Sequence, residues 1–162
     1  MPSAKTILKA ALIVGTLDII AASTQFYLKT GKAPFKPVLT FVASCLLGKK
    51  AFAAGDGIML LGLLIHYCVA TAFTLFFFFT IANARFAHQQ KLLTGILYGA
   101  FVWVVMNLVV LPFTQASRLP KDFWSVVTGM LILICCIGIP LAFLSAGFHP
   151  LYKRRTYAGA AS

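Results

Sequence analysis

Three polar side chains lie inside long apolar stretches of the sequence and are the residues best placed to do chemistry. Asp18, His66 and Asn107 each have apolar neighbours on both sides. An ionised Asp at the centre of a membrane-spanning helix costs roughly 2.5 to 3.5 kcal/mol on membrane-insertion scales. A carboxylate and an imidazole at one depth can share or relay a proton. The same pair can instead serve only to fix which helices are neighbours.

The positions of these side chains within the apolar stretches place them at related depths. Asp18 lies ten residues before Leu28, the expected end of the first span, and His66 lies nine residues after Gly57, the expected start of the second. At 1.5 Å per residue, both are about 14 to 15 Å from the same membrane surface. By the same arithmetic Asn107 is about 10 Å from that surface. We therefore expect one polar layer that contains Asp18, His66 and Asn107.

The remaining chemical motifs are few. Four cysteines are present, with no Cys-x-x-Cys pair and no His at zinc-finger spacing, so we expect no metal and no disulfide framework. The sequence has no glycine-rich phosphate loop, nucleophile elbow or paired-carboxylate motif. We expect no cofactor. The interpretation leans away from an enzyme, although a membrane enzyme that acts on lipid or quinone stays open.

The composition places the chain in a membrane. Hydrophobic residues make up 60% of the 162 residues, and the mean hydropathy is +0.93, well outside the balance of soluble globular proteins. Lys and Arg outnumber Asp and Glu by 14 to 3, and the basic residues lie between apolar stretches. Anionic lipid headgroups are the natural counter-charge at such positions. The sequence therefore predicts membrane lipids as partners and argues against nucleic acid.

Four apolar stretches are long enough to span a membrane as helices, because about 20 residues cross a hydrocarbon core of about 30 Å. They cover residues 7–28, 57–84, 92–113 and 123–148. A further apolar stretch, residues 37–48, is too short to cross and predicts an interfacial helix or a re-entrant half-helix. The predicted fold is an all-α integral membrane protein. It is a four-transmembrane-helix bundle with this short helix in its first loop, forming a single membrane domain over 1–162.

Four glycines in the spans predict close contacts between helices, because small residues let membrane helices approach each other. They are Gly15, Gly62, Gly95 and Gly99. Gly95 and Gly99 form a Gly-x-x-x-Gly pair, which can pack against another span of the same chain or against a second subunit. We favour packing within the chain.

An even number of spans places both termini on one side of the membrane. Seven basic residues lie on that side and seven on the other, so the positive-inside rule does not choose an orientation. The cluster of Lys153, Arg154 and Arg155 after the last span favours cytoplasmic termini.

Several ordered strings in the sequence carry a resemblance to a known group of proteins. They are GTLD from Gly15, FVASCLLGKKAF from Phe41, GLLIHY from Gly62, LYGAFVWVVMNLVVLP from Leu97 and GIPLAF from Gly138. Together they resemble a group of small, uncharacterised bacterial four-helix inner-membrane proteins and, distantly, the YagU-like proteins. The resemblance implies a multi-pass protein of the bacterial inner (plasma) membrane and brings no established activity. The chain departs from the group at residues 132–136, where relatives tend to carry a His.

Three functional interpretations follow from these patterns. The leading one is a structural or accessory membrane component of unknown activity, whose polar layer specifies helix packing, with a homo-oligomer or a membrane-complex partner left open. The alternative is a small proton-coupled transporter or channel that uses Asp18 and His66. The third is the membrane enzyme.

Overall fold

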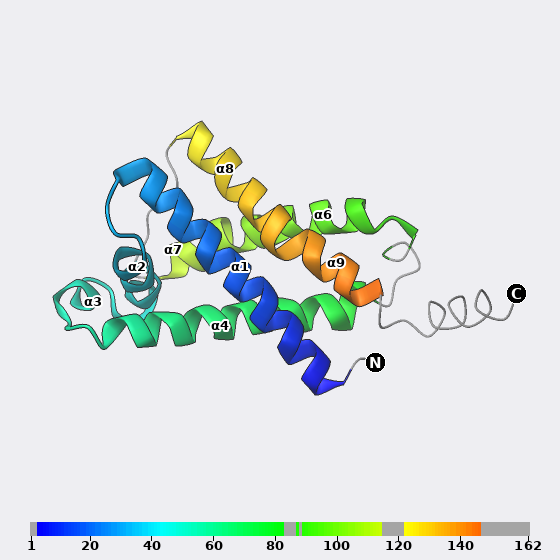
Figure 1. Ribbon diagram of the computed structural model, residues 1–162, viewed down its shortest axis with the longest axis horizontal. Coiled ribbons are helices and arrows are strands. Elements are labelled where there is room, and N and C mark those ends of the chain that lie inside the picture. Colours follow the sequence, from blue (N-terminus) through cyan, green and yellow to red (C-terminus); the bar gives the residue numbers. More distant parts are fainter. Residues whose placement is uncertain (1–2, 83–86, 88, 115–121, 147–162) are drawn as a thin grey trace, which may run out of the picture.

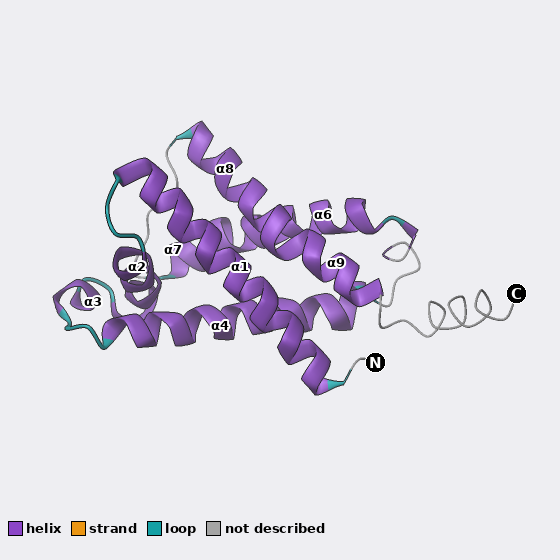
Figure 2. Ribbon diagram, viewed as in Figure 1, coloured by secondary structure: helices purple, strands orange, loops and turns teal. Residues whose placement is uncertain are grey.

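The computed structural model describes residues 3–82, 87, 89–114 and 122–146, and within these ranges every regular element is a helix (Figures 1 and 2). Four helical units are long and apolar enough to cross a membrane. They are α1 (Ala4–Thr30), α4 with η1 (Ile58–Phe76, Phe77–Ile81), α6 with η2 and α7 (Lys91–Val104, Val105–Val110, Leu111–Phe113), and α8 with η3 and α9 (Phe123–Leu133, Ile134–Gly138, Ile139–Ala146). The predicted all-α bundle of four spans is confirmed.

The four units exceed the thickness of a hydrocarbon core. The apolar spans in them contain 27, 24, 23 and 23 residues, the last from Phe123 to Ser145, which corresponds to about 34 Å or more at 1.5 Å per residue. The predicted ends at residues 84 and 148 lie outside the described residues. In Figure 1, α1 begins and α9 ends at the same end of the bundle, as an even number of spans requires.

Helix α1 has defined signals at both ends. The Ser3 hydroxyl accepts a hydrogen bond from the Thr6 backbone N–H (3.3 Å), which satisfies one of the unpaired donors of the first turn. At the other end Gly31 adopts φ +65°, and its N–H donates to the Tyr27 carbonyl (2.7 Å). A left-handed residue of this kind favours glycine because it has no Cβ. These residues stop the first span and turn the chain toward the short helix.

The short apolar stretch forms a helix that lies across the spans. In Figure 1, α2 (Phe35–Leu47) is viewed nearly down its axis, whereas α1 and α4 run along the plane of the picture. One face of α2, which includes Leu39 and Ala43, is buried. The ammonium group of Lys36 forms an ion pair with Asp56, at 2.7 Å. Of the two predicted forms, the crosswise direction favours a helix lying in the interface.

The contact between α2 and α4 depends on Gly62. A Cβ added at Gly62 would lie 2.8 Å from the carbonyl carbon of Leu39 and still closer to its oxygen, so any larger residue would displace α2. The nearest neighbour of Gly62 is therefore the backbone of the short helix.

The third and fourth spans touch through their backbones. A Cβ at Gly95 would lie 2.8 Å from Ile139 Cα, and one at Gly99 would lie 2.7 Å from the backbone nitrogen of Ile134. On the facing helix, a Cβ at Gly138 would lie 2.8 Å from the Gly99 nitrogen. The Gly-x-x-x-Gly pair is thus used within the chain, where three glycines allow α6 to approach η3 and α9.

Two of the spans contain a wide turn just before a proline. The Leu111 N–H donates to the Met106 carbonyl, and the Ile139 N–H donates to the Ile134 carbonyl, each five residues back in place of the usual four. The next residues are Pro112 and Pro140, which have no N–H to continue the regular ladder. The π-helical turns η2 and η3 therefore lie where proline interrupts the α-helical hydrogen bonds.

Aromatic rings fill the contact between α4 and α6. The buried hydroxyl of Tyr98 donates to the Phe73 carbonyl (2.6 Å), and the rings of Tyr98 and Phe77 meet edge to face at 4.8 Å. Nearby, the rings of Phe76 and Phe101 stack at 5.5 Å. The rings of Phe77 and Tyr98 belong to the main apolar core, whereas Phe76 and Phe101 stack on its exposed side.

We expect Gly95→Ala to destabilise the bundle, because its Cβ would meet the backbone of Ile139 and not a movable side chain. The loss should be about 1 to 3 kcal/mol, the usual cost of overpacking. Gly57→Ala is the matched control, since a Cβ there has nothing within 4 Å and Gly57 has φ −58°. Unfolding of both variants in detergent micelles measures the difference, and equal stabilities would contradict the close contact.

Candidate functional site

The candidate site lies where α1 crosses α4. The His66 Nε2 atom is 2.8 Å from the carbonyl oxygen of Gly15. Because a carbonyl can only accept a hydrogen bond, Nε2 must carry the hydrogen and donate it. The ring atom Nδ1 is left to accept a proton or to act as a base. His66 is therefore fixed in one orientation by the backbone of the first span.

A second polar contact lies directly beside the first. The hydroxyl oxygens of Thr16 and Tyr67 are 2.8 Å apart. Thr16 has one hydroxyl hydrogen, and it is directed to the Leu12 carbonyl at 2.7 Å, so Tyr67 must donate to Thr16. Two consecutive residues of α4 thus donate to two consecutive residues of α1.

Gly15 makes this crossing close enough for both bonds. A Cβ at Gly15 would lie 3.0 Å from the ring of Tyr67 and 3.2 Å from the Cβ of Ala70. The Tyr67 ring in turn meets the His66 ring edge to face, with centroids 5.6 Å apart. A larger residue at position 15 would push these rings and the helices apart. The small residue and the polar contacts therefore depend on each other.

Asp18 lies three residues after Gly15 and is half-buried. Its carboxylate interacts electrostatically with His66 of α4 and with Cys136 of η3. Within the described part of the chain, however, the side-chain carboxylate of Asp18 accepts no hydrogen bond and forms no ion pair. The structure brings Asp18 and His66 to one level without bonding them, and it adds a thiol from the fourth span.

Asn107 makes its hydrogen bond within its own helical unit. Its side-chain amide donates to the Trp103 carbonyl, four residues earlier in the same helical unit, at 3.0 Å. Among the described residues, no hydrogen bond joins Asn107 to Asp18 or His66. Asn107 therefore hydrogen-bonds within its own span, and a shared layer with Asp18 and His66 stays a prediction.

The interhelical contacts include residues that sequence reasoning missed. Thr16 and Tyr67 were not expected in the site, although each directly follows a residue that was, and hydroxyl groups are common hydrogen-bonding partners between membrane helices. The backbone of Leu39, which Gly62 contacts, has no signal in the sequence because a carbonyl is present at every residue.

The chemistry available here is that of a lone carboxylate beside a fixed imidazole. Among the residues that the structure describes, no three His, Cys, Asp or Glu side chains gather closely enough to hold a metal ion. The site can keep helices together through His66 and Tyr67. It can also hold a proton on Asp18.

Known proteins give no guide to this site. No protein-family model matches the chain. No curated protein and no solved structure matches it significantly. The functional conclusion therefore depends on the geometry described above.

We expect His66→Leu to weaken the contact between α1 and α4, because it removes the donor to the Gly15 carbonyl. The loss should be about 0.6 to 1.7 kcal/mol, the range for hydrogen bonds between membrane helices. His66→Gln keeps an N–H donor of similar reach and should retain part of that stability. Chemical unfolding in micelles gives the values. A loss from Asn107→Leu as large as that from His66→Leu would contradict the different roles assigned to these two residues.

Proposed function

We propose that this multi-pass membrane protein is a structural or accessory component of the membrane. Its four apolar helices make it a membrane protein. The observation that carries the proposal is that the polar groups of the α1–α4 crossing bond to one another. His66 donates to the Gly15 carbonyl, and Tyr67 donates to Thr16.

These bonds support packing over transport for a physical reason. A transport path needs polar groups that face a wet passage and exchange partners as a solute moves. At this crossing the donors of His66 and Tyr67 are instead taken by the backbone and a hydroxyl of the neighbouring helix. Gly15, Gly62, Gly95 and Gly99 likewise bring helices into direct contact. The polar and small residues together specify which helices are neighbours.

The proposal includes a location. The resemblance to small bacterial inner-membrane proteins supports a bacterial inner membrane, and the Lys-Arg-Arg cluster at 153–155 supports cytoplasmic termini. An accessory role is compatible with self-association or with a partner in a membrane complex. A second copy of the chain or another membrane protein can bind at the outer surface of the bundle.

A second candidate, a small proton-coupled transporter or channel, is favoured by Asp18. The Asp18 carboxylate lies in a membrane span and accepts no hydrogen bond from the described residues. A carboxylate with a purely structural role would be paired with a donor or a cation. The neighbouring imidazole can exchange a proton with it. Asp18 would then carry the proton, and His66 would be the group that receives it.

Proton flux into liposomes separates the two candidates. We expect purified protein in liposomes that contain a pH-sensitive dye to give no flux above empty liposomes when a potassium diffusion potential is imposed. The double variant Asp18→Asn with His66→Gln should insert, fold and give the same trace. Asp56→Asn is the matched control, because Asp56 is an exposed carboxylate outside the spans.

The opposite result would replace the structural proposal with the transport one. That result is a flux in the native protein that Asp18→Asn abolishes and Asp56→Asn leaves intact. Circular dichroism of each reconstituted variant shows whether a lost flux reflects lost chemistry or lost structure.

A further inference from the structure

The basic residues around α2 have no acidic side chain left to pair with. The whole chain contains three acidic residues, and the structure describes all of them. Asp18 lies within the bundle beside His66. Asp122 caps α8, accepting from a backbone N–H at 3.2 Å, and Asp56 pairs with Lys36. The positive charge at this end of the bundle must therefore be balanced from outside the chain.

Not every lysine near α2 is available for an outside partner. Lys36 is neutralised by Asp56, and the hydrogen bond and positive charge of Lys36 lower the pKa of that carboxyl group. Lys29 donates to the hydroxyl of Ser125, at 2.8 Å. Lys49 and Lys50, by contrast, are exposed, and their ammonium groups form no hydrogen bond or ion pair with any described residue.

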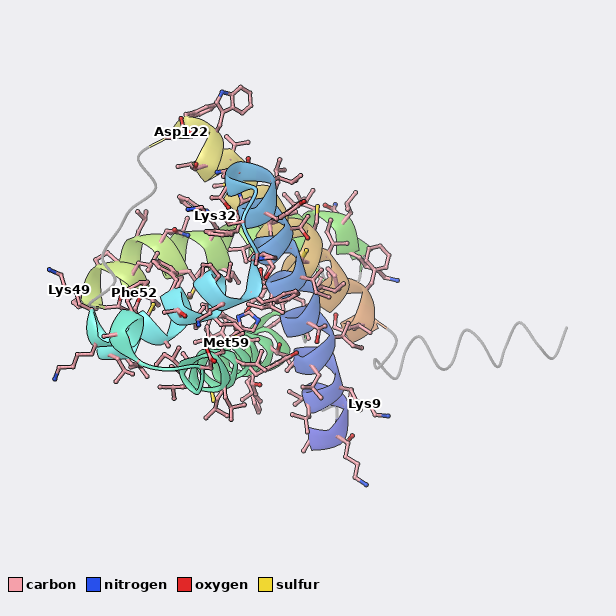
Figure 3. All side chains as sticks on the ribbon, turned by 60° about the vertical axis from the view of Figure 1, so that its left-hand side comes forward. Lys9, Lys32, Lys49, Phe52, Met59 and Asp122 are labelled. Carbon is pink, nitrogen blue, oxygen red and sulfur yellow. The ribbon has the colours of Figure 1, made fainter. Side chains whose placement is uncertain are left out.

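Large apolar side chains lie exposed in the same segment. Leu46 near the end of α2 is 62% exposed, and Phe52 in α3 (Lys50–Ala53) is 64% exposed. Figure 3 shows Lys49 and Phe52 at one edge of the molecule, away from Lys9 and the start of α1. Cationic groups interleaved with exposed apolar groups are typical of segments that lie at the boundary between headgroups and acyl chains.

We propose that the end of α2 and α3 form a binding surface for anionic phospholipid headgroups. Lys49 and Lys50 contact the lipid phosphates, while Leu46 and Phe52 enter the acyl region beneath them. Helix α2 holds the surface in place because it lies across the spans and is anchored to α4 at Gly62. The partner is an anionic lipid because positive charges without internal counter-charges are attracted to a negative membrane surface.

Native mass spectrometry of the full chain from nanodiscs tests this proposal. The nanodiscs contain equal amounts of phosphatidylglycerol, which is anionic, and phosphatidylcholine, which is neutral overall. We expect the native protein to retain phosphatidylglycerol preferentially. The double variant Lys49→Gln with Lys50→Gln should lower that preference roughly tenfold, since each lysine near an anionic surface contributes a few-fold in affinity.

Lys5→Gln with Lys9→Gln is the matched control. It removes the same charge from exposed lysines of α1, at the opposite end of the bundle. We expect the control to change the lipid preference less than twofold. Both double variants should have the same unfolding temperature as the native protein. A native protein that shows no preference for phosphatidylglycerol, or an equal loss in both double variants, overturns the proposal.

Discussion

The fold depends on how closely the helix backbones approach each other at glycine. Lipid tails are as apolar as the helix surfaces, so apolar burial alone does not hold two spans together, and close packing must contribute. At Gly95 and Gly99 the backbone of α6 rests on that of η3 and α9, and at Gly62 the backbone of α4 meets α2. At Gly15 the approach is slightly wider and admits the Tyr67 ring. Only this closeness lets His66 reach a carbonyl of the neighbouring helix.

The polar side chains of the spans are of two kinds, those that donate a hydrogen bond and one that has no hydrogen-bond partner among the described residues. His66 and Tyr67 give their hydrogens to the facing helix, and Asn107 gives its own to a carbonyl one turn away. Each of these groups donates one hydrogen bond to a fixed acceptor, so each stabilises one arrangement of the backbone. Asp18 has no such partner among the described residues, and it therefore stays able to exchange a proton. The structural and the protonatable functions thus belong to adjacent residues of one site.

Hydropathy and helical spacing predicted the four spans and the short fifth helix, because both depend on length and apolar content alone. Depth arithmetic predicted that Asp18 and His66 lie at one level, and the structure bonds His66 to the carbonyl of Gly15, one turn before Asp18. The same arithmetic gives a depth for Asn107 but not its hydrogen-bond partner, because height along a helix does not determine which way a side chain faces. Asn107 lies inside the wide turn η2, where the regular angular spacing no longer holds. The direction of α2 depends on a backbone contact at Gly62, which residue types do not reveal.

The wide turns and the glycine contacts have a common consequence for the fourth span. Pro140 interrupts the ladder that would otherwise bond the Cys136 carbonyl to the next turn, and η3 forms just before it. This same segment is where Gly99 meets Ile134, and it contains Cys136, which interacts electrostatically with Asp18. The fourth span therefore packs against the third through the same segment in which proline interrupts its α-helical hydrogen bonds.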